Sequence, residues 1–467
     1  MTIRPPSRTH HVHGIPLPSH VHIERCAGLL LLVMTVAVAC DASAPAPPGA
    51  TMSVADLLGG ADTLHARAIE PRAFTFPLDH GPHPDYRTEW WYFTGNLTTA
   101  DGRELGYQLT FFRSALTDSA SYAAANSAAS GSDVATGGGA DVAGATGAGG
   151  AAGGGADVAG ATGAGAAAGA GATAVGGAAG ASAPSRSPWR SRHAYMAHFA
   201  VSDAATGQFE AAERFARAAQ GLAGATAEPL RIWLEDWSAE SLNATTFPLR
   251  LRASAGDIAI DLVVERGKPI VLQGDRGLSR KGPEPGNASY YYSMTRMPTR
   301  GTIRTAEGTW TASGTSWLDR EWSTSVLSPG VTGWDWLSLQ MDDSTELMMY
   351  RLRRADDAVD PFSAATFVAP DGSTRSIPAS GFTMAPTRSW TSADGTAYPV
   401  AWRITVPALD LALDVAAAID DQELNLAVRY WEGMVQATGT RAGGRVTGRG
   451  YLELTGYDSP ANRRTRR

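Results

Sequence analysis

The sequence contains only two cysteines, Cys26 and Cys40, among its 467 residues. Both lie in an N-terminal segment that has the features of an export signal, so the folded part of the chain has no cysteine pair. An internal disulfide and a cysteine-ligated metal site are therefore excluded from that part. Its folding must depend on side-chain packing alone.

An excess of positive charge is also missing. Lysine and arginine total 39 while aspartate and glutamate total 46, which gives a formal net charge of −7. An acidic chain is a poor general binder of polyanions, so we expect no nucleic-acid partner.

Common catalytic and cofactor motifs are absent from the folded part. We find no Gly-x-Ser-x-Gly elbow, P-loop, His-Glu-x-x-His helix or dinucleotide-binding glycine pattern. A run of histidines at positions 10–22 lies in the segment expected to be removed, and the other histidines are scattered. We therefore predict no metal and no cofactor. His198, which lies in a strand-like run, is interpreted as a core residue in preference to a base.

Residues 27–39 form an apolar run that follows Arg25 and ends in small residues. The run is shorter than the ~20 residues that a membrane-spanning helix needs, and it is typical of a signal peptide, here residues 1–39. Cys40 follows Ala-Val-Ala, which approximates the cleavage box of bacterial lipoproteins and predicts a lipid anchor at Cys40. The alternative is plain secretion with cleavage nearby. Both interpretations place an exported protein in the bacterial cell envelope, with residues 40–70 as a linker.

Residues 119–187 are almost entirely Ala, Gly, Ser and Thr, and the segment at 139–149 recurs at 155–165. Such a composition cannot bury enough apolar surface to offset the entropy of ordering, so we predict a disordered insert. Strand-like runs precede and follow it. Because loop closure entropy grows only logarithmically with length, a loop between neighbouring strands tolerates such an insertion.

Most of the remaining sequence has the pattern of β-strands. The aromatic-rich runs 89–97 and 104–113 flank Asp101-Gly102, which predicts a β-hairpin. Residues 210–222 have an apolar spacing that would also fit a helix. Short strands bounded by turn residues predict an all-β fold of antiparallel barrels or sandwiches. The other strand-like runs are 194–202, 231–237, 249–252, 258–265, 290–296, 310–319, 334–340, 347–353, 400–406, 409–415, 424–430 and 451–455.

A segment rich in proline and glycine, 268–289, divides these runs into two series. We therefore predict an N-terminal β domain over 71–267 and a C-terminal β domain over 290–458, with a tail over 459–467. The length that remains without leader and insert suits two domains of ordinary size.

Eight of the thirteen tryptophans lie in four close pairs, and one of these pairs lies in the predicted strand 334–340. Strand alternation places Trp334, Trp336, Ser338 and Gln340 on one face and Asp335, Leu337 and Leu339 on the other. Aromatic and polar side chains together suit the wall of a cavity that holds an apolar ligand. The alternative is that tryptophan simply fills a wide barrel.

Asp319-Arg320-Glu321-Trp322 is the densest charged group near aromatic residues. If the group is partly buried, Arg320 should lower the pKa of both carboxyls and make either one a poor general acid. A ligand-orienting network is favoured over acid catalysis. A glycosidase pair such as Glu89 with Glu321 is a weaker alternative, because sequence gives no carboxylate spacing.

Five long motifs stand out in the sequence, at residues 89–97, 106–113, 273–282, 317–322 and 429–433. Together they resemble the tandem lipocalin-like family that includes AttH-type proteins, predicted secreted hydrolases and carotenoid 1,2-hydratase. The resemblance implies two lipocalin-like antiparallel β-barrels, export, and an apolar ligand. In the hydratase branch of this family an Asp-His-Asn-Trp-Gly motif acts with a downstream Tyr and Asp. Here Trp322 and Tyr350 match, but Arg320 occupies the His position and Leu352 the Asp position.

Because arginine cannot deliver a proton, we expect an exported protein that binds a hydrophobic small molecule or lipid without catalysis. One alternative is a hydratase-like lyase or secreted hydrolase that uses Asp319, Glu321 or Tyr350. Another is an accessory subunit of an envelope transporter. The predicted ligand-binding residues are Trp90, Tyr92, Tyr107, Gln108, Asp319, Arg320, Trp322, Trp334, Trp336 and Tyr350.

Overall fold

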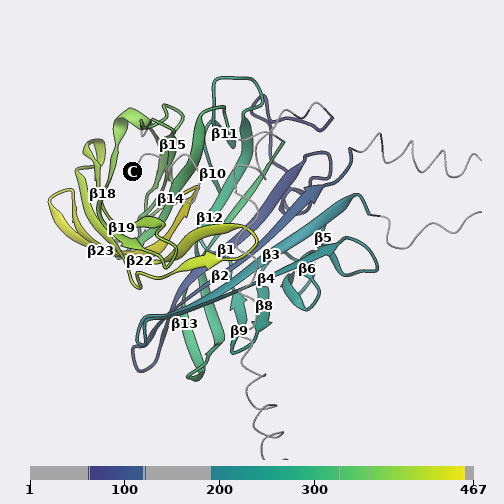
Figure 1. Cartoon of the computed structure of the whole chain (residues 1–467), viewed down its shortest axis with the longest axis horizontal. Coiled ribbons are helices and arrows are strands. Elements are labelled where there is room, and N and C mark those ends of the chain that lie inside the picture. Colours follow the sequence, from purple (N-terminus) through teal and green to yellow (C-terminus); the bar gives the residue numbers. More distant parts are fainter. Residues whose placement is uncertain are drawn as a thin grey trace, which may run out of the picture. The chain divides into compact units, whose positions relative to one another are not determined.

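Aromatic and β-branched residues, alternating with polar ones, fold into two antiparallel sheets (Figure 1). The computed structural model describes residues 62, 64–118, 121, 191–324, 327–356 and 358–457, all within the unit Ala50–Arg467. The first sheet is a nearly closed barrel and the second is a curled half-barrel, which confirms the predicted all-β class and the two barrel-like sheets.

The first sheet is built from strands up to Ser323, in the order β4-β3-β2-β1-β13-β12-β9-β8-β7-β6-β5, with β10 and β11 paired to β12. A short 3₁₀ helix, η1 (Leu78–His80), precedes β1. The strands are β1 (Thr88–Thr99), β2 (Glu104–Ala115), β3 (His193–Asp203), β4 (Gln208–Arg217), β5 (Ala223–Ala227), β6 (Leu230–Leu234), β7 (Trp237–Ser241), β8 (Leu249–Ala255), β9 (Ile258–Val264), β10 (Val271–Leu272), β11 (Leu278–Arg280), β12 (Ala288–Thr305) and β13 (Gly308–Ser323).

The second sheet follows in the order β17-β16-β15-β14-β23-β22-β20-β19-β18, with β21 paired to β22. Two 3₁₀ helices, η2 (Ala379–Gly381) and η3 (Pro407–Leu409), lie between its strands. The strands are β14 (Val331–Met341), β15 (Glu346–Arg354), β16 (Ala364–Val368), β17 (Thr374–Pro378), β18 (Thr383–Thr391), β19 (Ala397–Val406), β20 (Leu411–Ala417), β21 (Glu423–Asn425), β22 (Arg429–Arg441) and β23 (Gly444–Thr455).

Each sheet encloses its own apolar core. Trp91, Phe93, Trp237 and Trp322 are fully or almost fully buried in the core of the first sheet, and Trp402 and Trp431 in that of the second. The alternative interpretation of tryptophan as barrel filling is therefore correct for these residues. The interiors of both sheets are packed with side chains. A ligand site is therefore expected outside these two cores.

The boundary between the sheets differs from the predicted inter-domain segment at 268–289. Strands β12 and β13, which we had assigned to the C-terminal series, pair with each other, and β13 also pairs with β1. The first sheet therefore extends to Ser323, and the second begins at Val331. The prolines and glycines of 268–289 mark the short strands β10 and β11, not the change of sheet.

The helix considered for residues 210–222 is not formed. Residues Gln208–Arg217 are strand β4, which pairs with β3 along its whole length, from Ala194 opposite Arg217 to Asp203 opposite Gln208. The predicted hairpin is confirmed, because β1 pairs with β2 and Gly102 has a positive φ of 89° in the connecting turn.

The expected signal peptide over 1–39, the anchor at Cys40 and the tail over 459–467 lie outside the described residues, as does nearly all of the insert over 119–187. The strands on either side of the insert are neighbours, as predicted, since Ala115 of β2 pairs with His193 of β3. In the part of the chain that the structure describes, no helix has the length and apolar character to span a bilayer.

Candidate functional site

The outer faces of the two sheets meet around a second set of buried aromatic residues. Strand alternation turns Trp91 and Phe93 of β1 into the first core and leaves Trp90 and Tyr92 on the outer face. On β14 the same alternation turns Leu337 and Leu339 into the second core and Trp334 and Trp336 outward. The predicted division of strand 334–340 into two faces is therefore confirmed.

Close approach of the sheets depends on glycine at one contact. A Cβ atom on Gly106 of β2 would lie 2.6 Å from the Tyr451 hydroxyl of β23, which is closer than real Cβ contacts. Asn96 also donates from Nδ2 to the carbonyl oxygen of Gly450 at 3.3 Å. These contacts fix the strands that carry the site against one another.

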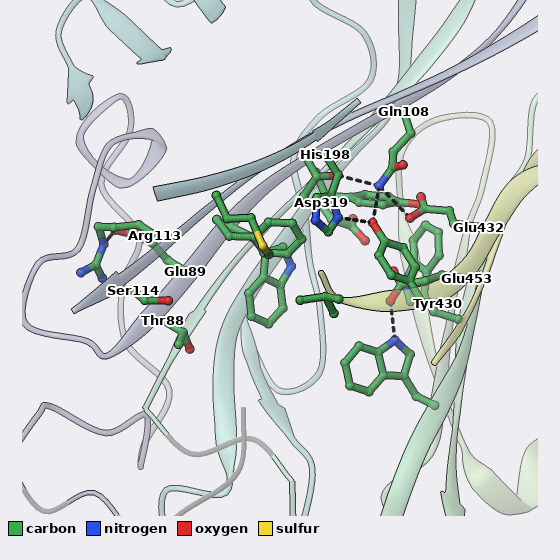
Figure 2. A pocket seen from close by; sticks show the side chains of 18 residues that line it. Thr88, Glu89, Gln108, Arg113, Ser114, His198, Asp319, Tyr430, Glu432 and Glu453 are labelled. Atoms are coloured by element: carbon green, nitrogen blue, oxygen red, sulfur yellow. Dashed lines mark hydrogen bonds and ion pairs between the residues drawn. The ribbon is translucent and has the colours of Figure 1, made fainter. Parts of the chain in front are cut away.

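A cavity of about 110 Å³ lies between the outer faces. Its walls come from both sheets, with apolar rings and methyl groups alternating with a few polar tips (Figure 2). The lining residues are Thr88, Glu89, Trp90 and Tyr92 of β1; Gln108, Thr110, Phe112, Arg113 and Ser114 of β2; Met196 and His198 of β3; Asp319 of β13; Trp334 and Trp336 of β14; Val428 before β22; Tyr430 and Glu432 of β22; and Glu453 of β23.

Asp319 lies at the base of this cavity in a ring of donors. Its Oδ1 accepts hydrogen bonds from Ser293 Oγ at 2.5 Å and Trp317 Nε1 at 2.7 Å, and its Oδ2 accepts from Tyr291 at 2.5 Å. Burial raises the pKa of Asp319 to about 7, although these hydrogen bonds act in the opposite direction. The carboxyl is thus poised between its neutral and charged forms near neutral pH.

The prediction that Arg320 holds Asp319 ionised was wrong. On β13, Asp319 and Glu321 face the second sheet, whereas Arg320 and Trp322 face the interior of the first. Arg320 binds the carboxylate of Glu89 and donates to the carbonyl oxygen of Gly81 at 2.5 Å. It lies over the ring of Trp91 at 3.9 Å and does not line the cavity.

Glu453 carries one hydrogen bond from the cavity wall, since Trp334 Nε1 donates to its Oε1 at 2.9 Å. Burial raises the pKa of Glu453 to about 8, with a smaller contribution from the neighbouring charges of Asp319 and Glu321. At pH 7 this group is therefore mostly a neutral carboxylic acid that can donate a proton.

Gln108, Tyr430 and Glu432 form a polar wall in the same cavity (Figure 2). Gln108 Nε2 donates to the Tyr430 hydroxyl at 2.9 Å and to Glu432 Oε2 at 2.8 Å. Burial, together with the charge of Glu453, raises the pKa of Glu432 well above its usual range. Burial therefore favours the uncharged form of this wall.

His198 lies behind this wall and contacts it. Its Nδ1 is 2.7 Å from the Tyr430 hydroxyl, and its ring stacks on that of Tyr430 with centroids 5.5 Å apart. Burial lowers the pKa of His198 to about 3, so the imidazole is neutral. The residue is buried, as its core interpretation requires, but it also lines the cavity.

Six of the ten predicted ligand-binding residues line the cavity: Trp90, Tyr92, Gln108, Asp319, Trp334 and Trp336. The other four are Tyr107, Arg320, Trp322 and Tyr350, and none of them reaches it. Tyr107 and Trp322 point into the first core. Of the remaining catalytic candidates, Tyr350 lies beside Lys281, and Glu321 accepts a hydrogen bond from Ser289 and forms an ion pair with Lys281.

Sequence analysis missed the acidic residues on the last two strands. Because residues two apart on a strand lie on one face, Glu432 shares a face of β22 with Tyr430, and Glu453 shares a face of β23 with Tyr451. A carboxyl on the aromatic face of a buried strand was the signal that could have found them. No cluster of three or more His, Cys, Asp or Glu side chains suited to a metal ion occurs among the residues that the structure describes.

The protein thus belongs to the all-β proteins in which two antiparallel sheets pack together, with a pocket lined in part by carboxyl groups between them. The family model described as AttH-like matches residues 67–137 and 173–457, and this chain belongs to the AttH-like family. The family resemblance predicted from the motifs is thereby confirmed.

The solved structures that are similar to this chain include two that cover most of it. One, described as an AttH from Nitrosomonas europaea, is 30% identical with a TM-score of 0.61, covering 84% of this chain and 99% of that one. The other is kievitone hydratase from Nectria haematococca, 12% identical with a TM-score of 0.56, covering 90% of this chain and 100% of that one, which shows a shared fold. No curated protein matches the chain.

Proposed function

We propose that the protein binds an apolar or amphipathic small molecule in the cavity between the sheets and adds water to a carbon–carbon double bond of that molecule. The observation that carries this proposal is Glu453, a partly buried carboxyl in a largely apolar cavity wall, which forms no ion pair among the described residues and whose pKa is raised to about 8. The name of one relative of the same fold, a hydratase, supports the choice of reaction.

Glu453 is the proton donor in this proposal. Its carboxyl proton moves to one carbon of the double bond, and the π electrons form the new C–H bond. The other carbon becomes a carbocation. The oxygen of a water molecule then forms a C–O bond to this carbon, and a proton from that oxygen returns to Glu453. The carboxyl is regenerated, and the net change is addition of one water to the substrate.

The indole rings around the cavity suit the charge that forms in this reaction. Trp90, Trp334 and Trp336 line the same space as Glu453, and the face of an indole ring attracts a positive charge. The carboxylate left by proton transfer is a second source of stabilisation, because opposite charges interact more strongly in a partly desolvated site than in bulk water.

The size of the cavity limits the ligand. Its volume of about 110 Å³ is somewhat below that of an engineered cavity of roughly 150 Å³ that holds benzene. The branched end of an isoprenoid chain fits such a space, whereas an entire carotenoid does not. Short prenyl compounds are therefore the substrates to test.

The test is incubation of the purified protein with short isoprenoid alkenes in ¹⁸O-labelled water, with labelled alcohol measured by mass spectrometry. We expect Glu453→Gln to lower kcat at least about 100-fold, the usual contribution of general acid catalysis. The matched control is Glu284→Gln, which changes an exposed glutamate outside the cavity.

An unchanged rate in Glu453→Gln would overturn the assignment of the proton donor. If ligands bind but no alkene is hydrated, the chemical part of the proposal is wrong and a binding protein without catalysis, as the sequence predicted, is the correct description.

We further propose that Cys40 anchors the exported protein to a membrane of the bacterial envelope, where it could also serve a transporter as an accessory subunit. The apolar run ahead of Cys40 supports this proposal. Mass spectrometry of the mature N-terminus would detect the lipid, and Cys40→Ala should release the protein from membranes. A transporter that copurifies with the anchored protein but is absent from mock extracts would support the accessory role.

A further inference from the structure

We infer that the cavity selects a neutral amphiphile whose polar end is a hydroxyl group, and that it discriminates against carboxylates such as fatty acids. This inference rests on the proposed ligand-binding function and narrows its ligand class. It is independent of whether the ligand is then hydrated.

The first argument is the absence of a cation at the polar wall. Among the described residues that line the cavity, Arg113 is the one Lys or Arg side chain. Its Nε donates to Glu89, and its Nη2 donates to the carbonyl oxygens of His83 at 3.0 Å and Tyr86 at 2.7 Å, while its Nη1 is buried without a hydrogen-bond partner among the described residues. Arg113 and Glu89 lie together, apart from Tyr430 and Glu432 (Figure 2). A carboxylate at the polar wall would therefore lose its hydration without gaining a counter-charge.

The second argument is the negative charge that the titratable groups facing the cavity carry when they ionise. Asp319, Glu432 and Glu453 all present carboxyls to it, and none of them forms an ion pair within the described chain. Any of these groups that ionises repels an anionic ligand. Burial raises the pKa of all three carboxyls and so disfavours their charged forms, which weakens the attraction for a cationic amine that still loses its hydration.

The third argument is an unsatisfied amide on the polar wall. Gln108 Nε2 has three oxygens within 3.1 Å, those of Thr110, Tyr430 and Glu432, but only two hydrogens to donate. Its Oε1 is buried and has no hydrogen-bond partner among the described residues. A buried polar atom without a partner costs about 1–3 kcal/mol. A ligand hydroxyl can both donate and accept, so it would satisfy this amide in either orientation.

The remaining walls suit the apolar end of such a ligand. Trp90, Phe112, Met196 and Val428 line the cavity together with the polar wall and present rings, a thioether and methyl groups. A molecule with its hydroxyl at Gln108 would therefore place the adjoining carbons among these side chains, and a chain longer than the cavity would extend beyond it, since the cavity is not enclosed. This arrangement of a few polar groups in an apolar pocket fixes ligand orientation.

The experiment compares geraniol, geranic acid and geranylamine, which share a carbon skeleton and differ in the polar end. Each is titrated into the purified protein at pH 7, with tryptophan fluorescence as the signal, because Trp90, Trp334 and Trp336 line the cavity. We expect the Kd for geraniol to be at least about tenfold lower than for either charged compound, a difference of about 1.4 kcal/mol.

A Gln108→Leu variant tests the polar wall itself. We expect it to raise the ratio of the Kd for geraniol to the Kd for the hydrocarbon myrcene at least about fivefold, the effect of one lost hydrogen bond of about 1 kcal/mol. The control is Gln436→Leu, which changes an exposed glutamine of β22 outside the cavity.

The outcomes separate this inference from the proposed function. Equal or tighter binding of geranic acid or geranylamine would overturn the inference alone. If none of the compounds binds, both the proposed function and the inference are wrong. Preferential binding of geraniol without hydration would contradict the proposed reaction and support the ligand class.

Discussion

Glu453→Gln is expected to change the free energy of unfolding in a way that depends on pH. A carboxyl whose pKa is raised by folding keeps its proton in the folded state while the unfolded state releases it. Stability is therefore lost as pH rises from the unfolded pKa of 4.5 towards the folded value of about 8. Since one pKa unit corresponds to about 1.4 kcal/mol, the loss between pH 4 and pH 8 is about 4 kcal/mol.

Glutamine does not ionise, so the variant avoids this loss. Its new, partly buried N–H group costs at most about 1–3 kcal/mol, and this cost is the same at every pH. The difference in unfolding free energy between variant and native protein should consequently shift by about 4 kcal/mol in favour of the variant between pH 4 and pH 8. Urea unfolding at the two pH values measures this shift.

The exposed variant Glu284→Gln is the matched control and should show almost no shift. A shift below about 1 kcal/mol for Glu453→Gln would refute the argument that burial keeps this carboxyl neutral. A variant that loses activity while gaining stability at pH 8 would be the combination expected of a residue kept for function at the expense of the fold.

Three further outcomes are expected. Deletion of 119–187 should change the free energy of unfolding, measured by urea titration, by no more than about 1 kcal/mol. The reason is that Ala115 and His193 already pair, and residues 116–118 and 188–192 remain to connect them. A larger loss would mean that the insert packs on the fold. Glu89→Gln should cost about 3–5 kcal/mol by the same measurement, since it leaves Arg113 and Arg320 buried without their carboxylate, and a loss below about 1 kcal/mol would contradict this. The His198 imidazole should stay neutral from pH 5 to pH 8 in ¹⁵N NMR spectra, because burial lowers its pKa to about 3; titration near 6.5 would show that it is solvated.

Local pattern was sufficient to predict the individual strands. The hairpin β1–β2 has aromatic residues on both sides of an Asp-Gly turn, and the sequence places it within two residues of its observed bounds. Pairing of distant strands has no such local signal. The contact of β13 with β1 joins residues more than two hundred positions apart, so the assignment of β12 and β13 to the first sheet could not be predicted.

The helical alternative at 210–222 failed for a related reason. Strand β4 is only partly buried, and its side chains do not show a clean alternation of buried and exposed positions. Alanine and glutamate in Glu210-Ala211-Ala212-Glu213 favour a helix locally. Hydrogen bonding along β3 determines the strand, and the sequence of β4 alone does not contain this information.

The candidate site was partly predictable. Trp334 and Trp336 were found because two aromatic residues share a face of a strand, and the cavity beside them is present. The role of Arg320 was misjudged because adjacent strand residues point to opposite faces, so sequence proximity to Asp319 did not mean contact. Glu453 and His198 come together from strands far apart in the chain, and no spacing in the sequence indicates that they meet.

The pairing of β1 with β13 also has a consequence for biogenesis. Synthesis has to proceed to Ser323 before Thr88 can meet its partner, so the first sheet can close only after its last strand has been made. Until then one edge of the aromatic β1–β2 hairpin stays unpaired and can join with strands of other chains. Holdase chaperones that keep this edge covered during synthesis should therefore increase the yield of folded protein.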